Sequence, residues 1–108
     1  MSEKRICLFC GSSPGRLDLY AQTAADLGRK LAASGTGLVY GGGRVGLMGA
    51  AADAALEAGG EVIGIIPKAI CDLEVQHKGC TELHVVESMH IRKQLMHDKS
   101  DGFITLPG

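Results

Sequence analysis

Hydrophobic and polar positions follow one another along the chain in blocks that predict strands and helices in turn. Five short apolar runs, each closed by glycine or polar residues, predict buried strands at 5–10, 38–40, 61–66, 83–86 and 102–106. Small or apolar residues at helical spacing predict three helices. The first begins at Asp18 and stops at Gly35, the second covers 46–58, and the third covers 89–99. Residues 67–81 form a connection that can hold one short helical turn.

Strands that alternate with helices pair in parallel through right-handed crossovers. The strands are apolar almost without interruption, as in sheets covered on both faces. The pattern therefore predicts an α/β fold, a Rossmann-like doubly wound parallel sheet. Such a sheet needs a helix after its fifth strand, whereas the sequence stops at Gly108. We expect residues 1–108 to form a single incomplete domain, truncated after the fifth strand, with its C-terminal part absent.

Charge and hydropathy exclude several classes of partner. A net charge of −1 creates no field for polyanions, so neither nucleic acid nor an anionic membrane is an expected partner. The apolar run near the N-terminus is too short for a signal peptide, and no segment approaches the roughly 20 apolar residues that cross a bilayer. We expect a cytoplasmic protein.

The four cysteines do not form a metal-binding pattern. Cys7 and Cys10 lie in one predicted strand, where side chains three positions apart point to opposite faces. Cys71 and Cys80 have no partner ligands at the short spacings of zinc sites. We expect reduced thiols and no metal or other cofactor.

Four segments that follow predicted strands carry the candidate chemistry. In open α/β sheets, ligands bind beyond the carboxyl ends of the strands, where the strand order reverses. The segments at that edge are 11–13, 41–46, 87–93 and 107–108. Their common location favours one shared site.

Residues 41–46 match G-x-G-x-x-G between a strand and a helix. Glycines at these positions let backbone N–H groups approach a phosphate at a helix N-terminus. A dinucleotide site also needs an acid at the end of the following strand, but that strand ends in Ile65-Ile66-Pro67-Lys68. No P-loop is present. Phosphate or ribose binding is favoured over NAD, and a packing turn without a ligand is the alternative.

The third predicted helix places an arginine at the same edge. Ser88 is a suitable N-cap, and Arg92, one turn later, can bind a phosphate or a hydroxyl pair with two nitrogens. The alternative is a solvated basic surface that includes Lys93. Met89 and Met96 are typical of core packing, and no third ligand accompanies the two histidines at 90 and 97, which we interpret as structural or surface residues.

Together these segments resemble the Lonely Guy family, which is often labelled lysine decarboxylase-like. The matching motifs are C-G-S-S-x-G at 10–15, Y-G-G-G-x-x-G-L-M-G at 40–49, S-M-H-x-R-K at 88–93, and the start of P-G-G-x-G-T-x-x-E at 107–108. The resemblance implies hydrolysis of the N-glycosidic bond of purine riboside 5′-monophosphates, either AMP or N6-substituted cytokinin nucleotides, to the free base and ribose 5-phosphate. It also implies a metal-free enzyme that forms a homodimer or higher homo-oligomer. Decarboxylation has no support, because no lysine has a recognisable pyridoxal phosphate context.

The resemblance assigns a catalytic, transition-state-stabilising role to Arg92. It assigns substrate binding to Gly41, Gly42, Gly43, Ser88, Met89 and Lys93. The location at strand ends adds further substrate-binding candidates: Gly11, Ser12, Ser13, Gly46, Pro107 and Gly108. The family's catalytic glutamate falls after Gly108, and cleavage builds positive charge on the ribose that a carboxylate must stabilise. We therefore expect an enzyme as the parent protein and an inert chain over 1–108.

Two other classes of function stay open. A non-catalytic nucleotide- or phosphate-binding Rossmann-like module would use the same glycines and need no glutamate. A dimerisation scaffold built on the alanine-rich second helix would bind no nucleotide. An uncovered fifth strand with an apolar face would also promote self-association.

Overall fold

The computed structural model describes residues 4–9, 18–43, 46–70, 77 and 79–105. Its elements follow the predicted order of strands and helices: β1 (Lys4–Phe9), α1 (Asp18–Ala33), β2 (Thr36–Tyr40), α2 (Gly46–Glu57), β3 (Val62–Pro67), the 3₁₀ turn η1 (Lys68–Ile70), β4 (Glu82–Val86), α4 (Met89–Asp98) and β5 (Gly102–Thr105). The predicted elements are confirmed with end points that differ by one or a few residues. Within the described residues, no helix combines the length and the apolar character needed to cross a membrane.

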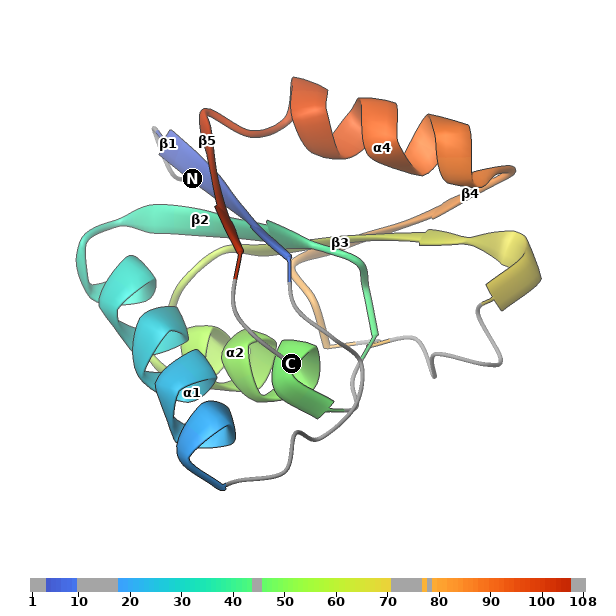
Figure 1. Ribbon diagram of the computed structural model, residues 1–108. Coiled ribbons are helices and arrows are strands. Elements are labelled where there is room, and N and C mark those ends of the chain that lie inside the picture. The colour runs from blue at the N-terminus through green and yellow to red at the C-terminus, as the bar shows by residue number, and fades with distance from the viewer. Residues whose placement is uncertain (1–3, 10–17, 44–45, 71–76, 78, 106–108) are drawn as a thin grey trace.

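The five strands form one parallel sheet in the order β4-β3-β2-β1-β5. Helices α1 and α2 cover one face, and α4 lies on the other (Figure 1). This arrangement confirms the doubly wound α/β fold. The chain adds strands outward from β1 to β4 and then crosses back, through α4, to place β5 on the other side of β1. The strand order therefore reverses between β1 and β5.

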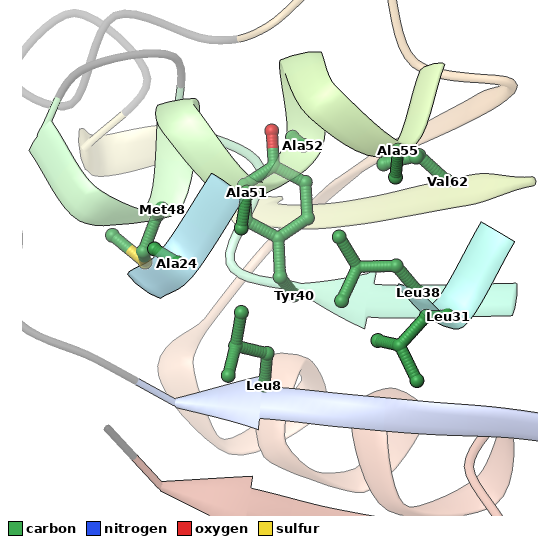
Figure 2. Close-up of a cluster of buried hydrophobic side chains, with 10 residues drawn as sticks. All are labelled: Leu8, Ala24, Leu31, Leu38, Tyr40, Met48, Ala51, Ala52, Ala55 and Val62. Carbon is green, nitrogen blue, oxygen red and sulfur yellow. The ribbon is translucent and has the colours of Figure 1, made fainter. Parts of the chain in front are cut away.

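Alternation along each strand builds a separate core on each face. Leu8, Leu38, Tyr40 and Val62 point toward α1 and α2, where they meet small helical side chains such as Ala51 (Figure 2). The intervening strand residues point to the opposite face and pack with Met96 of α4: Cys7, Val39, Ile63 and Ile65. Burial on both faces explains why these strands have almost continuous apolar sequences.

Helices α1 and α2 approach each other unusually closely because their facing residues are small. A side chain on Gly28 would overlap the carbonyl oxygen of Ala51, and one on Gly60 would lie 2.7 Å from Cβ of Ala32. Small residues thus bring the two helical backbones into direct contact. This explains the alanine-rich composition of α2 without a separate dimerisation role.

Candidate functional site

The carboxyl edge of the sheet collects the candidate segments. By the general rule for open α/β sheets, the ligand crevice lies outside the strand ends where the order reverses, here between β1 and β5. The segments that follow these two strands include Gly11, Ser12, Ser13, Pro107 and Gly108, all of which lie outside the described residues. Of the candidate segments, the described residues include the turn after β2 and the first turn of α4.

Residues 41–43 form the glycine turn, which leads from β2 toward Gly46, the first residue of α2. Gly42 has φ +84°, a left-handed conformation that favours glycine. Its Cα lies 2.9 Å from the position that a Cβ on Gly64 would occupy. The turn is therefore pressed against the backbone of β3, and glycines on both sides make this approach feasible.

Arg92 joins the glycine turn to β3. The hydrogen-bonded pairing of β2 with β3 ends at Tyr40 and Gly64. Arg92 binds the carbonyl oxygen of the residue that follows each of them in the chain. Its Nε donates to Ile65 O over 2.9 Å, and its Nη2 donates to Gly41 O over 2.6 Å. The guanidinium thus bridges two strands at the point where they stop pairing.

The environment of Arg92 differs from the alternative interpretation, a solvated basic helix surface. The residue is only 9% exposed, although it lies one turn into a helix at the molecular edge. A Cβ on Gly41 would overlap Nη2, so the guanidinium occupies the space that any larger residue would need. The two-nitrogen contact expected for a ligand is directed at backbone carbonyls, which fixes the orientation of the positive charge.

The other residues singled out in α4 surround this arginine. Ser88 is the N-cap as predicted, and its Oγ accepts a hydrogen bond from the amide of Ile91 over 3.2 Å. Met89 is 48% exposed rather than buried, and its Sδ lies 3.7 Å from Nη1 of Arg92. Lys93 is exposed beside them. The described edge therefore presents a thioether and an ammonium group next to a fixed guanidinium.

The remaining side chains of α4 that were singled out lie in the core or on the surface, as the sequence predicts. Met96 is buried in the core, as expected. His90 and His97 are exposed, and the His97 ring stacks on Phe103 with a centroid distance of 5.8 Å. Among the described residues, no group of three or more His, Cys, Asp or Glu side chains is arranged to hold a metal ion.

Two described thiols are free and poorly ionised. Cys7 is fully buried under α4, and burial raises the pKa of its thiol to about 11. Burial also raises the pKa of Cys80 and that of the Tyr40 phenol, whose hydroxyl lies 3.6 Å from Sγ of Cys80. These groups stay protonated near neutral pH, so neither thiol is an activated nucleophile.

Three polar residues that support the glycine turn were not predicted from the sequence. The Tyr40 hydroxyl donates to Gly43 O over 2.7 Å, and the His77 amide donates to Gly42 O over 2.7 Å. Asp53 of α2 contacts the His77 ring at 2.6 Å. A tyrosine at the end of a buried strand was the available signal, because a buried phenol needs a hydrogen-bond partner nearby. The pairing of Asp53 with His77 has no local spacing that could have revealed it.

Two hollows on the described surface lie away from this edge. One is lined by residues at the amino ends of the strands and the neighbouring helix ends: Ala32, Gly35, Thr36, Gly59, Gly60, Glu61 and Thr81. The other lies along one side of α1, between Gln22 and Arg29. Neither contains a residue that was assigned to the site.

Known proteins with similar sequences include enzymes that act on nucleotides. The sequence model of a family described as "possible lysine decarboxylase" matches residues 48–108. A cytokinin riboside 5′-monophosphate phosphoribohydrolase of Rhodococcoides fascians is 53% identical over 106 residues, which cover 97% of this chain and 54% of the relative. An enzyme of the same name from Arabidopsis thaliana is 48% identical, over 97% of this chain and 46% of the relative. The chain thus spans about half the length of these curated relatives.

Solved structures show the same fold at greater evolutionary distance. The molybdenum cofactor binding protein of Rippkaea orientalis superposes with a TM-score of 0.81 at 23% identity, covering 100% of this chain and 64% of that one. The Moco carrier protein of Chlamydomonas reinhardtii gives a TM-score of 0.80 at 22% identity, over 97% of this chain and 62% of that one. The family model covers more than half of the sequence, and the Lonely Guy motifs that carried the resemblance include Arg92 and the glycine turn. The chain belongs to the Lonely Guy family, whose sequence model carries the description "possible lysine decarboxylase".

Proposed function

We propose that the protein containing this chain hydrolyses the N-glycosidic bond of purine riboside 5′-monophosphates, releasing the free base and ribose 5-phosphate. The observation that carries the proposal is the bond from Arg92 to the glycine turn, at the edge where this fold binds ligands. The names of the two related phosphoribohydrolases support the same substrate class.

The proposed chemistry divides between positioning and charge stabilisation. The glycine turn, together with the segments at 11–13 and 107–108, binds the phosphate and ribose of the nucleotide. Arg92 is held by two backbone carbonyls, so its charge is preorganised and needs no reorientation when the substrate binds. We assign it the orientation of phosphate or hydroxyl groups in the transition state. Met89 and Lys93 lie beside it as further substrate contacts.

Cleavage of the glycosidic bond also needs an acidic group. Positive charge develops on the ribose as the base departs, and a carboxylate stabilises that charge while the leaving base is protonated. A guanidinium cannot perform this role because it is itself a cation. The family resemblance assigns it to the glutamate of the P-G-G-x-G-T-x-x-E motif, of which this chain carries Pro107 and Gly108.

The test is a product assay on the full-length protein. Incubation with AMP, and separately with N6-isopentenyladenosine 5′-monophosphate, is followed by chromatography of the base and enzymatic detection of ribose 5-phosphate. Equimolar release of base and sugar phosphate is the expected result, and the ratio of kcat/KM for the two nucleotides gives the substrate preference. Release of carbon dioxide from lysine, without nucleotide cleavage, would contradict the proposal.

A non-catalytic nucleotide-binding module is the second candidate. It is favoured by one observation, namely that Arg92 is buried and engaged with the backbone, as a purely structural arginine would be. The same assay separates the two candidates. Saturable AMP binding in calorimetry without any release of adenine would identify the module.

We also propose that the protein is a cytoplasmic homodimer or higher homo-oligomer. Large apolar side chains lie exposed on the sheet face beside α4, where Phe9 and Phe103 stack with a centroid distance of 6.1 Å while being 41% and 49% exposed. Exposed apolar patches of this kind are typical of protein interfaces. Free thiols at Cys7 and Cys80 agree with a reducing compartment.

A further inference from the structure

The three carbonyls of the glycine turn accept hydrogen bonds from three different parts of the chain. Gly41 O accepts from Arg92 of α4, Gly42 O from the backbone amide of His77, and Gly43 O from the Tyr40 hydroxyl of β2. The distances are 2.6 Å, 2.7 Å and 2.7 Å. The orientation of every peptide carbonyl in the turn is therefore set by a donor outside it.

Of the three donors, His77 has a side chain that makes hydrogen bonds of its own to two other residues. It lies in the connection between β3 and β4, away from the regular ladder, and is only 9% exposed. Its ring Nδ1 accepts a hydrogen bond from the amide of Gly79 over 3.1 Å. Nδ1 must then be unprotonated, which places the ring proton on Nε2. That proton is donated to Oδ1 of Asp53 over 2.6 Å.

These contacts connect two segments that flank the turn. Asp53 belongs to α2, the helix into which the glycine turn leads, whereas His77 and Gly79 belong to the connection after β3. The His77 ring thus has a hydrogen-bond partner at both nitrogens, which restrains the side chain and, through it, the position of the residue whose amide binds Gly42 O. We call the set Asp53, His77 and Gly79 the histidine latch.

The latch acts on a turn whose shape determines which groups it presents. In a trans peptide the C=O and N–H groups point in opposite directions. Because the carbonyls of Gly41 and Gly42 point toward Arg92 and His77, the amides of Gly42 and Gly43 face away from those donors. Amides on that side could bind the phosphate or ribose oxygens of a nucleotide.

We propose that His77 is a positioning residue that holds the glycine turn in its ligand-binding shape, through the amide that it donates to Gly42 O. The role rests on the proposed nucleotide site at this turn. His77 itself contacts the turn only through its backbone, so it acts on substrate through Gly42 and performs no chemistry of its own.

The test compares H77A with two variants that keep part of the latch. In H77N, the side-chain Oδ1 stands near the position of Nδ1 and retains the bond from Gly79. In D53N, the amide oxygen still accepts from the neutral His77 ring. The full-length variants are assayed for KM and kcat with AMP, and amide hydrogen exchange is measured at Gly42 and Gly43 by NMR.

Loss of the latch should reduce the population of the binding-competent turn. We expect H77A to raise KM for AMP about tenfold while kcat changes less than about twofold, because a tenfold smaller competent population weakens apparent binding by that factor. Exchange at Gly42 and Gly43 should accelerate in parallel. H77N should recover part of the loss, and D53N should resemble the wild type.

Several outcomes would overturn this role. An unchanged KM in a folded H77A variant would exclude positioning, as would unchanged exchange at Gly42 and Gly43. If H77A does not fold, the comparison of D53A with D53N decides, since only D53A removes the acceptor. Absence of turnover in the wild type would contradict the proposed function, whereas the exchange measurements would still decide whether His77 controls the turn.

Discussion

The guanidinium Nη2 of Arg92 donates a 2.6 Å hydrogen bond to the carbonyl oxygen of Gly41, 51 positions earlier in the chain. The bond spans the carboxyl edge of the sheet and joins α4 to the turn that precedes α2. It makes the glycine and the arginine interdependent, because one residue must lack a side chain for the other to occupy its position.

Substitution G41A should displace Arg92 and abolish most of the proposed activity. The added methyl group would overlap Nη2, so the guanidinium must leave its position between the two carbonyls. We expect a loss of roughly 100-fold in kcat/KM, as for the removal of one preorganised charge-stabilising donor. Steady-state kinetics with AMP measures it.

The matched control is G35A, where the backbone conformation is unfavourable for alanine but the added methyl group meets no neighbouring atom. Gly35 has φ +74°, but no atom lies within 4 Å of the position that a Cβ would occupy, so alanine there meets backbone strain without any overlap. It should lower the unfolding free energy by about 1 kcal/mol and leave kcat/KM unchanged. Equal activity losses in G35A and G41A would show that general destabilisation, rather than the arginine, is responsible.

Substitution R92K should fail to replace the arginine, although it keeps the charge. A lysine ammonium cannot reproduce the planar pair of donors that binds Ile65 O and Gly41 O. Loss of charged hydrogen bonds to buried carbonyls should lower the unfolding free energy by about 2 kcal/mol. Urea unfolding measures this, with the exposed neighbour Gln94 as the control site: Q94A should change stability by less than about 0.5 kcal/mol. A fully stable R92K would refute a bridging role.

Stability should fall at alkaline pH partly through Cys7. Burial raises the pKa of its thiol to about 11, from an ordinary value of 9.0. The unfolded chain therefore loses this proton first, so the contribution is complete below about pH 9 and is lost as pH rises toward about 11. Unfolding free energies measured across this range should decline less steeply in C7A than in the wild type, by on the order of 2 kcal/mol. Parallel profiles would mean that Cys7 does not ionise differently on folding.

The ion pair between Arg5 and Glu61 should contribute to stability and not to activity. Arg5 of β1 donates to the Glu61 carboxylate from Nε at 2.9 Å and from Nη2 at 3.2 Å, beside the amino end of the sheet. Removal of one partner from a partly buried pair should cost about 1–3 kcal/mol, so we expect that loss in E61A without a change in KM for AMP. Thermal unfolding and kinetics together test the separation, and a raised KM would show that the two edges of the sheet are coupled.

Self-association should depend on Phe103. This side chain of β5 stacks on Phe9 and His97 yet remains 49% exposed. Replacement by serine removes apolar area from the proposed interface and should shift the protein toward monomer in sedimentation velocity experiments. V85S is the matched control, because Val85 is similarly exposed but belongs to β4 at the opposite edge of the sheet. A monomeric wild type would exclude the interface.

The order of elements could be predicted from the sequence because each strand is a short apolar run and each helix has small or apolar residues at helical spacing. The apolar strand runs and the stops at Gly35 and Gly59 are properties of short windows, and the structure has the same elements with slightly different ends. The Ser88 cap was predictable for the same reason. The two-sided core follows directly from strands without polar positions.

The connections within the site could be predicted only in part. The location of Arg92 at the edge followed from its place after a strand, whereas its backbone partners depend on where β2 and β3 stop pairing. The contact between Asp53 and His77 joins residues 24 positions apart, one of them in a segment without any periodicity. The residue type of Met89 favoured core packing, whereas the family resemblance made it a substrate contact, and α4 turns the side chain outward.

The direct contact of α1 with α2 restricts where the molecule can move. Gly28 lies against the backbone of Ala51, and this close contact opposes sliding or tilting of either helix. We therefore expect α1 and α2 to move as one layer. Helix α4 packs on the other face through few buried residues, chiefly Arg92 and Met96. We therefore expect any movement that opens the proposed nucleotide site to come from α4, while α1 and α2 keep their positions.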